Sequence, residues 1–362
     1  MVNGRRRQGI PVKYVPAANY CSAGLIILCA ILFLFFLTPS ARGAEGDITI
    51  NYPPDGTVME FDTLSVSLTV TPGTFSSLTI YVNSDKKMEI VPERAFESFS
   101  VILDTGMNVI EIAGTKNDQL IDKKSIRVFR RSDLQRIYQT PPEGFQKDYF
   151  HGKDRSLCRP CHILQPGEND KKPVTVSAFP AEAVKGLSAS EAAKSTCYSC
   201  HKSLTARPFI HGPSAVWSCL SCHEPQSEPK YSVKKPDTKL CFGCHLVQKE
   251  KWYSKKYLHG PFNTGKCAIC HSPHASDYPY NLVRDTWDLC VGCHTDKGSG
   301  LHIVQKFFSA TYHPTRGKPD PSRKGQELTC ASCHDPHAAN NNKLWRFNVS
   351  SDFQLCMQCH GG

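Results

Sequence analysis

The sequence is poor in methionine, and one long segment has neither cysteine nor histidine. Only 5 of the 362 residues are methionine, and residues 46–130 contain no cysteine and no histidine. That segment therefore offers no thiol and no imidazole ligand. The whole chain nevertheless holds 18 cysteines and 15 histidines, so these residues are concentrated elsewhere.

The N-terminal segment lacks an apolar run of the length that crosses a membrane. Basic residues precede the apolar run 25–37, which is shorter than the roughly 20 residues of a membrane-spanning helix. Small residues at 41–43 are compatible with cleavage. We therefore predict a signal peptide over residues 1–43, with an uncleaved anchor as the alternative. The chain is then exported to the periplasm, the outer membrane or the cell exterior, and Cys21 and Cys29 are lost with the signal.

The exported part lacks the strong positive charge of a nucleic-acid-binding protein. The formal net charge is +10, but the first 42 residues contribute five cations and no acid, which leaves +5. Such a small excess is not the basic footprint that polyanion binding requires. We therefore expect no nucleic-acid partner.

Residues 46–130 show the two-residue alternation that is typical of β-strands. Apolar and polar residues alternate in 64–70, 78–82 and 108–112, and proline and glycine mark turns at 53–56 and 72–73. About seven such runs in roughly 85 residues predict an all-β, immunoglobulin-like sandwich. The cysteine pair and strand tryptophan of antibody domains are missing. A spacer or docking module is the default expectation for such a domain.

Cysteine, histidine, proline and glycine dominate from about residue 150 onward. The sequence Cys-x-x-Cys-His occurs eight times there and uses every cysteine after residue 43. The eight motifs are Cys158, Cys161, His162; Cys197, Cys200, His201; Cys219, Cys222, His223; Cys241, Cys244, His245; Cys267, Cys270, His271; Cys290, Cys293, His294; Cys330, Cys333, His334; and Cys356, Cys359, His360.

The spacing within the motif matches the chemistry of covalent haem attachment. Two thiols one helical turn apart can bond the two vinyl groups at one haem edge, and the adjoining imidazole then binds the iron as proximal ligand. Zinc sites also use paired cysteines, but tetrahedral zinc gives no reason for a histidine after every second cysteine. Redox disulfides share the spacing, but the βαβ pattern of thioredoxin-like folds is missing. The motifs predict eight covalently bound haem c groups with iron.

Seven further histidines lie outside the motifs, and five of them occupy repeated positions. His151, His211 and His259 each begin a His-Gly pair seven or eight residues before a motif. His274 and His337 each follow a proline, three residues after a proximal histidine. Because repeated placement indicates a shared role, we predict that these residues are distal iron ligands. The predicted distal set is His151, His211, His259, His274, His302, His313 and His337, of which His302 is the least patterned.

The motifs group into four modules, at about 150–205, 208–250, 256–300 and 302–362, here called modules 1 to 4. Each module has an upstream histidine, a first motif and a second motif, and modules 3 and 4 have Pro-His after the first motif. Module 2 departs from this pattern, because Glu224-Pro225 is followed by Gln226.

These modules resemble those of bacterial multihaem (octahaem) cytochromes c with doubled CxxCH motifs, over residues 150–362. The resemblance implies haems packed against one another, mostly bis-histidine irons, and electron transfer with redox partner proteins in the periplasm, at the outer membrane or outside the cell. We also expect that the chain could join an outer-membrane complex or assemble with further copies of itself into a filament. The expected fold is an immunoglobulin-like sandwich at 46–130 followed by a mostly irregular, short-helix cytochrome domain of four two-haem modules.

Seven distal candidates for eight irons leave one iron without a histidine of this chain. Met59, Met88 or Met107 could supply the ligand, a second subunit could, or the site is open; the deficit is expected in module 1 or 2. An open site would suit a reductase or oxidase of a small nitrogen or sulfur oxyanion. No catalytic residue stands out, however, and about 210 residues for eight haems are too few for a conventional core. We therefore expect an electron carrier rather than an enzyme.

Overall fold

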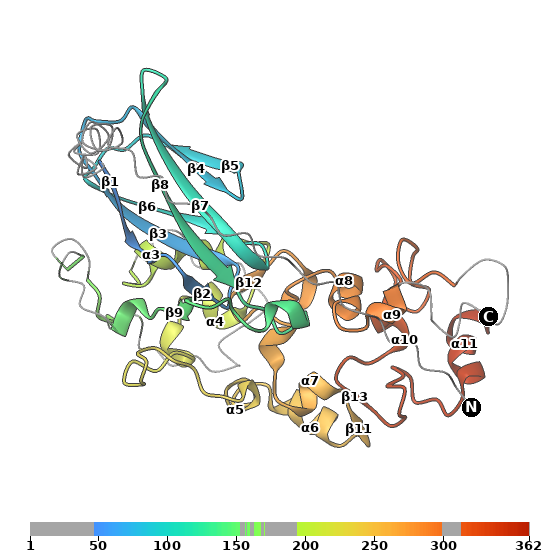
Figure 1. Ribbon diagram of the computed structural model, residues 1–362. Coiled ribbons are helices and arrows are strands. Elements are labelled where there is room, and N and C mark those ends of the chain that lie inside the picture. The colour runs from blue at the N-terminus through green and yellow to red at the C-terminus, as the bar shows by residue number, and fades with distance from the viewer. Residues whose placement is uncertain are drawn as a thin grey trace, which may run out of the picture. The chain divides into compact units, whose positions relative to one another are not determined.

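The computed structural model describes residues 47–152, 156, 158–159, 163–167, 170, 194–298 and 313–361 (Figure 1). The predicted signal peptide, Cys161, His162 and His302 lie outside these residues.

The alternating segments of the N-terminal part form strands with one buried face. In β3 (Thr63–Val70), the side chains of Leu64, Val66, Leu68 and Val70 are buried while those between them are half-buried. Gly56 and Gly73 adopt positive φ angles of 78° and 77° in the two predicted turns. The other strands are β1 (Ile48–Tyr52), β2 (Thr57–Met59), β4 (Ser77–Val82), β5 (Asp85–Ile90), β6 (Phe96–Ile102), β7 (Gly106–Lys116), β8 (Gln119–Arg130) and β9 (Gln146–Lys147).

These strands form two sheets that enclose one apolar core. One sheet has the order β1-β3-β6 and the other β5-β4-β7-β8-β2-β9. The pairs are antiparallel except those of β2 with β8 and β9, which are parallel. Ile48 and Leu64 from the first sheet and Ile80 and Ile110 from the second lie in the same fully buried cluster. The prediction of an N-terminal β-sandwich is confirmed, and β9 adds a strand beyond residue 130.

Beyond residue 150, the described chain consists of short helices, single helical turns and two-residue strands. The α-helices are α3 (Tyr198–His201), α4 (Gly212–Ala215), α5 (Asp237–Cys241), α6 (Leu246–Tyr253), α7 (Gly260–Asn263), α8 (Thr286–Val291), α9 (Thr295–Gly298), α10 (Cys330–Cys333) and α11 (Asp352–His360). The 3-10 turns are η1 (Arg136–Tyr138), which precedes this region, and η2 (Phe150–Gly152), η6 (Lys202–Thr205), η7 (Cys219–Ser221), η8 (Cys267–Ile269) and η9 (Pro279–Asn281). The prediction of an irregular, short-helix region is confirmed. Within the described ranges, no helix has the length and apolar character needed to cross a bilayer.

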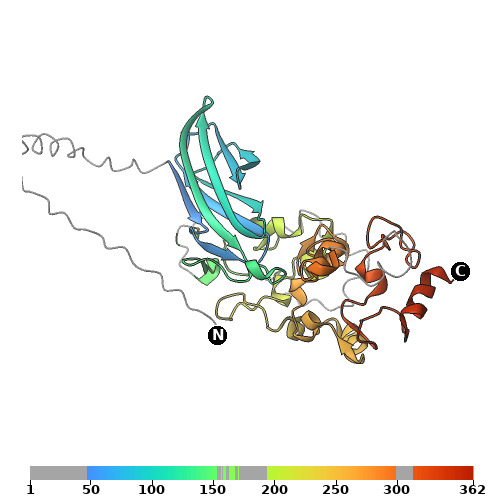
Figure 2. The same cartoon turned by 45° about the vertical axis from the view of Figure 1, so that its right-hand side comes forward.

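Two short antiparallel ladders join successive modules. β10 (Phe209–Ile210) of module 2 pairs with β12 (Ala275–Ser276) of module 3. β11 (Tyr257–Leu258) of module 3 pairs in the same way with β13 (Ala338–Ala339) of module 4. Modules 2, 3 and 4 follow one another from yellow to red in both views (Figures 1 and 2). Each ladder therefore fixes a segment of one module to the next.

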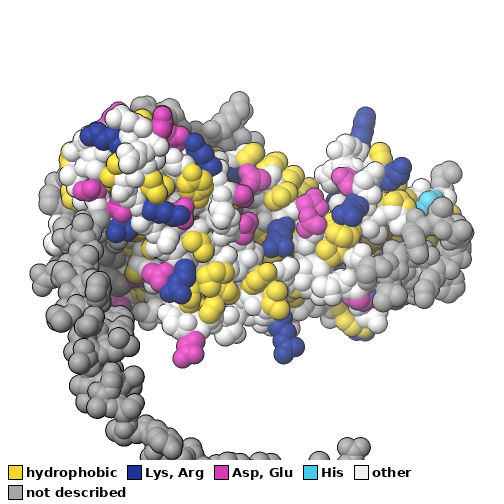
Figure 3. Space-filling model, turned by 45° about the horizontal axis from the view of Figure 1, so that its top comes forward, with side chains coloured by type: hydrophobic (Ala, Val, Ile, Leu, Met, Phe, Trp, Pro, Cys, Tyr) yellow, Lys and Arg dark blue, Asp and Glu magenta, His cyan; other side chains and the backbone are white. Residues whose placement is uncertain are grey.

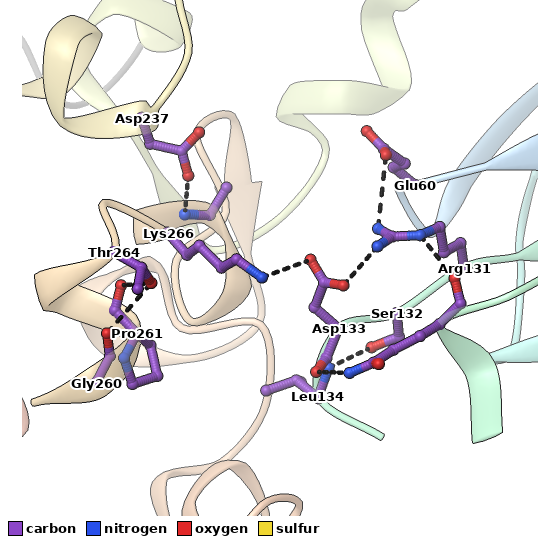
Figure 4. Close-up of polar contacts among 12 residues, drawn as sticks. Glu60, Arg131, Ser132, Asp133, Leu134, Asp237, Gly260, Pro261, Thr264 and Lys266 are labelled. Atoms are coloured by element: carbon purple, nitrogen blue, oxygen red, sulfur yellow. Dashed lines mark hydrogen bonds and ion pairs between the residues drawn. The ribbon is translucent and has the colours of Figure 1, made fainter. Parts of the chain in front are cut away.

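Ion pairs connect the sandwich to the motif-bearing segments (Figure 4). Arg131 directly follows β8. Its Nη2 lies 2.5 Å from Oδ1 of Asp133, and its Nη1 lies 3.7 Å from Oε1 of Glu60. The second carboxylate oxygen of Asp133 lies 3.9 Å from Nζ of Lys266, which directly precedes the motif at Cys267. Asp133 thus bridges a cation of the sandwich and a cation of module 3.

A second, less exposed contact joins β6 and the residue directly before β3 to the end of module 1 and the residues that link it to module 2. Arg207 Nη2 donates to Asp62 Oδ2 at 2.8 Å, and the two side chains are only 16% and 26% exposed. Ser203 Oγ bonds Ser100 Oγ at 3.1 Å. Because partial burial reduces screening by water, this ion pair contributes more to the attachment than an exposed pair would.

Two neighbouring residues of β7, one buried and one exposed, allow a test of the sandwich core. Ile110 is 0% exposed and Val109 is 40% exposed. We expect Ile110→Ala to lower the free energy of unfolding of the sandwich by about 2–5 kcal/mol, because it removes buried methyl groups and leaves a cavity. Val109→Ala is the matched control and should change it by less than about 0.5 kcal/mol. Urea denaturation followed by circular dichroism measures both, and equal losses would contradict the observed orientation of β7.

Candidate functional site

The Cys-x-x-Cys-His motifs fold as single helical turns. In six motifs the N–H of the histidine donates to the carbonyl of the first cysteine at 2.9–3.0 Å. The bond joins an N–H to the carbonyl four residues earlier, as in an α-helix. The two thiols therefore lie one turn apart on one side of the backbone. The histidines are His201, His223, His245, His271, His294 and His334. None of the fifteen cysteines in the described part of the chain forms a disulfide bond.

Among the described residues, six pairs of imidazole rings lie at nearly one distance. Their centroids are 6.0–6.2 Å apart, and each pair joins a motif histidine to a predicted distal histidine. The pairs are His201 with His151, His245 with His211, His223 with His274, His294 with His259, His271 with His337, and His360 with His313.

That distance fits an iron ion held between two imidazoles. Two metal–nitrogen bonds of roughly 2 Å in line, together with the radii of the two rings, add up to about the observed separation. Rings in direct contact lie closer, as the stacked pair of Trp252 and His337 does at 3.9 Å. The thiol pairs, the helical turn and the facing imidazoles together fit haem c.

Backbone carbonyls orient several of the imidazoles. A carbonyl can only accept a hydrogen bond, so the Nδ1 atom next to it carries the proton and Nε2 keeps the lone pair that binds iron. In modules 2, 3 and 4, the first-motif histidine makes this contact with a residue of the loop that follows. The contacts are His223 to Tyr231 at 2.7 Å, His271 to Tyr280 at 2.9 Å and His334 to Lys343 at 2.7 Å.

Burial keeps five of these imidazoles in the neutral form. Desolvation is the largest cause that lowers the pKa of each of them. For His274, burial together with neighbouring histidines lowers the pKa to about 4. Iron binds the neutral imidazole, so these side chains are in the ligating form at neutral pH. The five are His201, His211, His259, His271 and His274.

The short ladders place distal histidines of successive modules side by side. The N–H of His211 donates to the carbonyl of His274 at 2.8 Å, and that of His259 donates to His337 at 2.8 Å. The ring of each upstream histidine faces the second-motif histidine of its own module. The histidine of each Pro-His pair instead faces the first motif of the preceding module, as His274 does with His223.

Thiols of successive modules approach each other at three junctions. Each contact joins the first cysteine of a second motif to the first cysteine of the next module's first motif, and the two thiols are near enough to shift each other's pKa. In the pair of Cys290 and Cys330, the interaction between the two thiols raises the pKa of Cys290 and lowers that of Cys330 to about 7. Haem edges bonded to these sulfurs would lie near one another. The pairs are Cys197 with Cys219, Cys241 with Cys267, and Cys290 with Cys330.

A comparison with models of protein families found a match in this region of the chain. The family model described as "Doubled CXXCH motif" matches residues 211–250, 259–299 and 320–362. The likeness is to multihaem cytochromes c. The three matched segments imply covalently bound haem c with iron and favour electron transfer. The matches fall in modules 2, 3 and 4.

Two solved structures that are similar to part of the chain share little sequence with it. No curated protein matches the chain. The fibronectin(III)-like modules of CbhA from Clostridium thermocellum are 12% identical with a TM-score of 0.20, over 23% of this chain and 94% of theirs. A β-glucuronidase from Bacteroides uniformis is 12% identical with a TM-score of 0.18, over 23% of this chain and 10% of its own.

The candidate methionine ligands lie in the sandwich. Met59 and Met88 pack against its apolar core. Met107 is 43% exposed on β7. Among the remaining predicted residues, Cys161, His162 and His302 lie outside the described residues.

Asp335 is a site residue that the sequence analysis missed. Its Oδ1 accepts the N–H of His337 at 2.8 Å and lies 3.6 Å from Nδ1 of the same residue. Burial opposes ionisation of Asp335, but hydrogen bonds from His337 and from the N–H of Ala338 outweigh it and lower the pKa. The carboxylate is therefore charged beside a ring that faces His271. In module 3 the equivalent residue is Ser272, whose Oγ accepts the N–H of His274.

We expect Asp335→Asn to raise the reduction potential of the haem between His271 and His337. A carboxylate at Nδ1 makes the imidazole a more basic ligand and favours ferric iron. The shift should be on the order of 60 mV, which corresponds to a tenfold change for a one-electron couple. Spectroelectrochemistry measures it. Ser272→Ala, which removes no charge, is the control, and unchanged potentials in Asp335→Asn would show that the carboxylate does not act on the ligand.

Proposed function

We propose that the chain is an exported octahaem c-type cytochrome that conducts electrons along a line of mostly bis-histidine haems. The observation that carries this proposal is the set of histidine pairs at 6.0–6.2 Å. An iron with imidazoles on both faces has no vacant position for a substrate. Electron exchange is therefore the reaction that such an iron can perform.

The contacts between motifs support a continuous order of haems. Between modules, the adjacent thiols would bring haem edges together at three junctions. Between successive modules, the ladders also place distal ligands of different irons on hydrogen-bonded residues, such as His211 and His274. Each of modules 2, 3 and 4 is therefore tied to its neighbour through groups that would hold haem. This arrangement favours electron transfer along the chain from module to module.

The surroundings of the haem region favour protein partners. Lys and Arg side chains are interspersed with Asp and Glu on the face shown in Figure 3. A mixed surface of this kind suits transient contacts with redox proteins, whereas a nucleic acid needs a continuous basic field. The predicted signal peptide and this mixed surface together support a role in periplasmic, outer-membrane or extracellular respiration. Filament formation and an outer-membrane complex belong to the same proposal. The sandwich, attached through Asp62 and Asp133, would serve as a brace or docking module.

A chain fixed to an electrode at module 4 tests conduction. Lys324 is exposed, so Lys324→Cys provides a point of attachment to gold. We expect eight electrons per chain at fast scan rates, one for each motif. Replacing Cys241 and Cys244 with alanine should leave about four, because the path then ends after the two motifs of module 3.

The matched control replaces Cys356 and Cys359 with alanine. It also removes one haem, but at the last motif, so about seven electrons should still exchange. Intact-mass measurement confirms the haem content of each variant. Equal charge from the internal and the terminal variant would contradict conduction in chain order. Rapid turnover of nitrite, sulfite or hydroxylamine would favour the reductase alternative.

A further inference from the structure

Lysine is concentrated in the second half of module 2 and the residues that directly follow it. Residues 230–256 contain eight lysines and two acids, which gives this segment a net charge of +6. The whole chain after residue 42 carries only +5, so the remainder of it is close to neutral. The two propionates of one haem would offset this local charge only in part. An acidic partner therefore meets an uneven charge distribution on this chain.

Most of these lysines are exposed and have no counter-ion within the described part of the chain. Lys235 lies 2.6 Å from Asp237 and is the exception among the exposed ones. Lys255 is half-buried. The seven exposed lysines, here called the lysine surface, are Lys230, Lys234, Lys235, Lys239, Lys249, Lys251 and Lys256. Six of them thus present an uncompensated charge to solvent.

The lysine surface flanks the second motif of module 2 on both sides. α5 ends at Cys241, the first cysteine of that motif, and α6 begins directly after the motif histidine. Lys239 lies on α5, two residues before the motif, while Lys249 and Lys251 lie on α6. A haem bound by this motif therefore has lysines on the helix before it and on the helix after it.

Side-chain contacts hold the two helices together around the motif. The ring of Tyr253, at the end of α6, lies 5.7 Å from the ring of Phe242, which directly follows α5. At the start of α5, Oδ2 of Asp237 accepts the N–H of Ala268 in module 3 at 2.8 Å. The lysines of α5 and α6 are therefore kept near the iron site formed by the motif histidine and its distal partner.

The composition of this surface favours a protein over a nucleic acid. Leu246 and Val247, in the first turn of α6, are 55% and 75% exposed. Apolar side chains surrounded by charged ones are typical of protein–protein interfaces. Residues 230–256 contain no arginine, which is the residue that best recognises phosphate and nucleic acid. Lysine charges next to exposed aliphatic side chains match a carboxylate-rich protein surface.

We propose that the lysine surface is the docking site of an acidic electron-transfer protein, which exchanges electrons with the haem between His211 and His245. The inference rests on the proposed electron-carrying function. Those two imidazole rings are 6.1 Å apart. Opposite charges steer two proteins into contact and raise the association rate by about 10- to 1,000-fold. The site lies within the line of motifs, so electrons enter or leave the line between its ends.

Stopped-flow reduction of the oxidised holoprotein tests the proposal, with flavodoxin hydroquinone as a small acidic donor. Each productive encounter passes one electron from the flavin hydroquinone, which becomes the semiquinone, to a ferric iron, which becomes ferrous. The double variant Lys249→Glu, Lys251→Glu should lower the second-order rate constant by about tenfold or more at an ionic strength of about 0.01 M. The difference should nearly vanish at about 1 M salt, where charges are screened within about 3 Å.

The matched control is the double variant Lys318→Glu, Lys324→Glu. Both lysines are exposed in module 4, so the net charge changes by the same amount near a different pair of motifs. This control should slow reduction far less, because steering depends on where the charge lies. Equal slowing of the two double variants would show that net charge acts rather than this surface, and would overturn the proposal. An unchanged rate constant in the Lys249, Lys251 variant would also overturn it.

Flotation with vesicles of phosphatidylserine and phosphatidylcholine tests a membrane as the occupant. Loss of vesicle binding in the Lys249, Lys251 variant, together with unchanged reduction by flavodoxin, would make the lysine surface a membrane site and the proposal wrong. The number of electrons taken up at completion separates docking from conduction. It should be eight per chain in every variant, one for each motif. Incomplete uptake by the unmodified chain would contradict the proposed function, whatever the rate constants are.

Discussion

The need of a haem iron for two axial ligands on opposite faces is the constraint on which the C-terminal region depends. The motif fixes one imidazole by local backbone geometry, through a single helical turn. The second imidazole comes from a separate segment, and for His223 and His271 it comes from the following module. Ligation by both imidazoles would tie distant segments together more strongly than the short helices and ladders do, since metal binding is coupled to folding.

The two regions of the chain use different kinds of core. The sandwich buries aliphatic side chains from both sheets in one cluster, in the usual manner of β-proteins. Beyond residue 150, buried apolar side chains of the described residues are spread among several places, with Trp217, Phe262 and Trp345 far apart in the sequence. A region with so few buried side chains of its own relies on bound macrocycles for apolar interior. This explains why it needs no long helix or wide sheet among its described residues.

Local features of the structure could be predicted from the sequence, and long-range ones could not. The strand at 64–70 is specified by its own alternation, and the turn at Cys267 by its own motif, so both follow from short segments. The partner of His223 depends on a ladder between residues more than sixty positions apart in the sequence, which no local pattern encodes. The role of Asp335 depends in the same way on the fold of its loop around His337. The parallel addition of β9 to β2 was missed because two residues are too few for a pattern.

The ladder between β10 and β12 has a consequence for biosynthesis. In the proposed exported cytochrome, His274 is translated after the motif that it faces, so module 2 would not reach its final coordination until this part of module 3 had also been exported. In that interval the iron beside His223 would be exposed to whichever imidazole is nearest. Correct assembly would therefore depend on the order in which segments emerge from the export machinery, and a pause between modules would favour misligated intermediates.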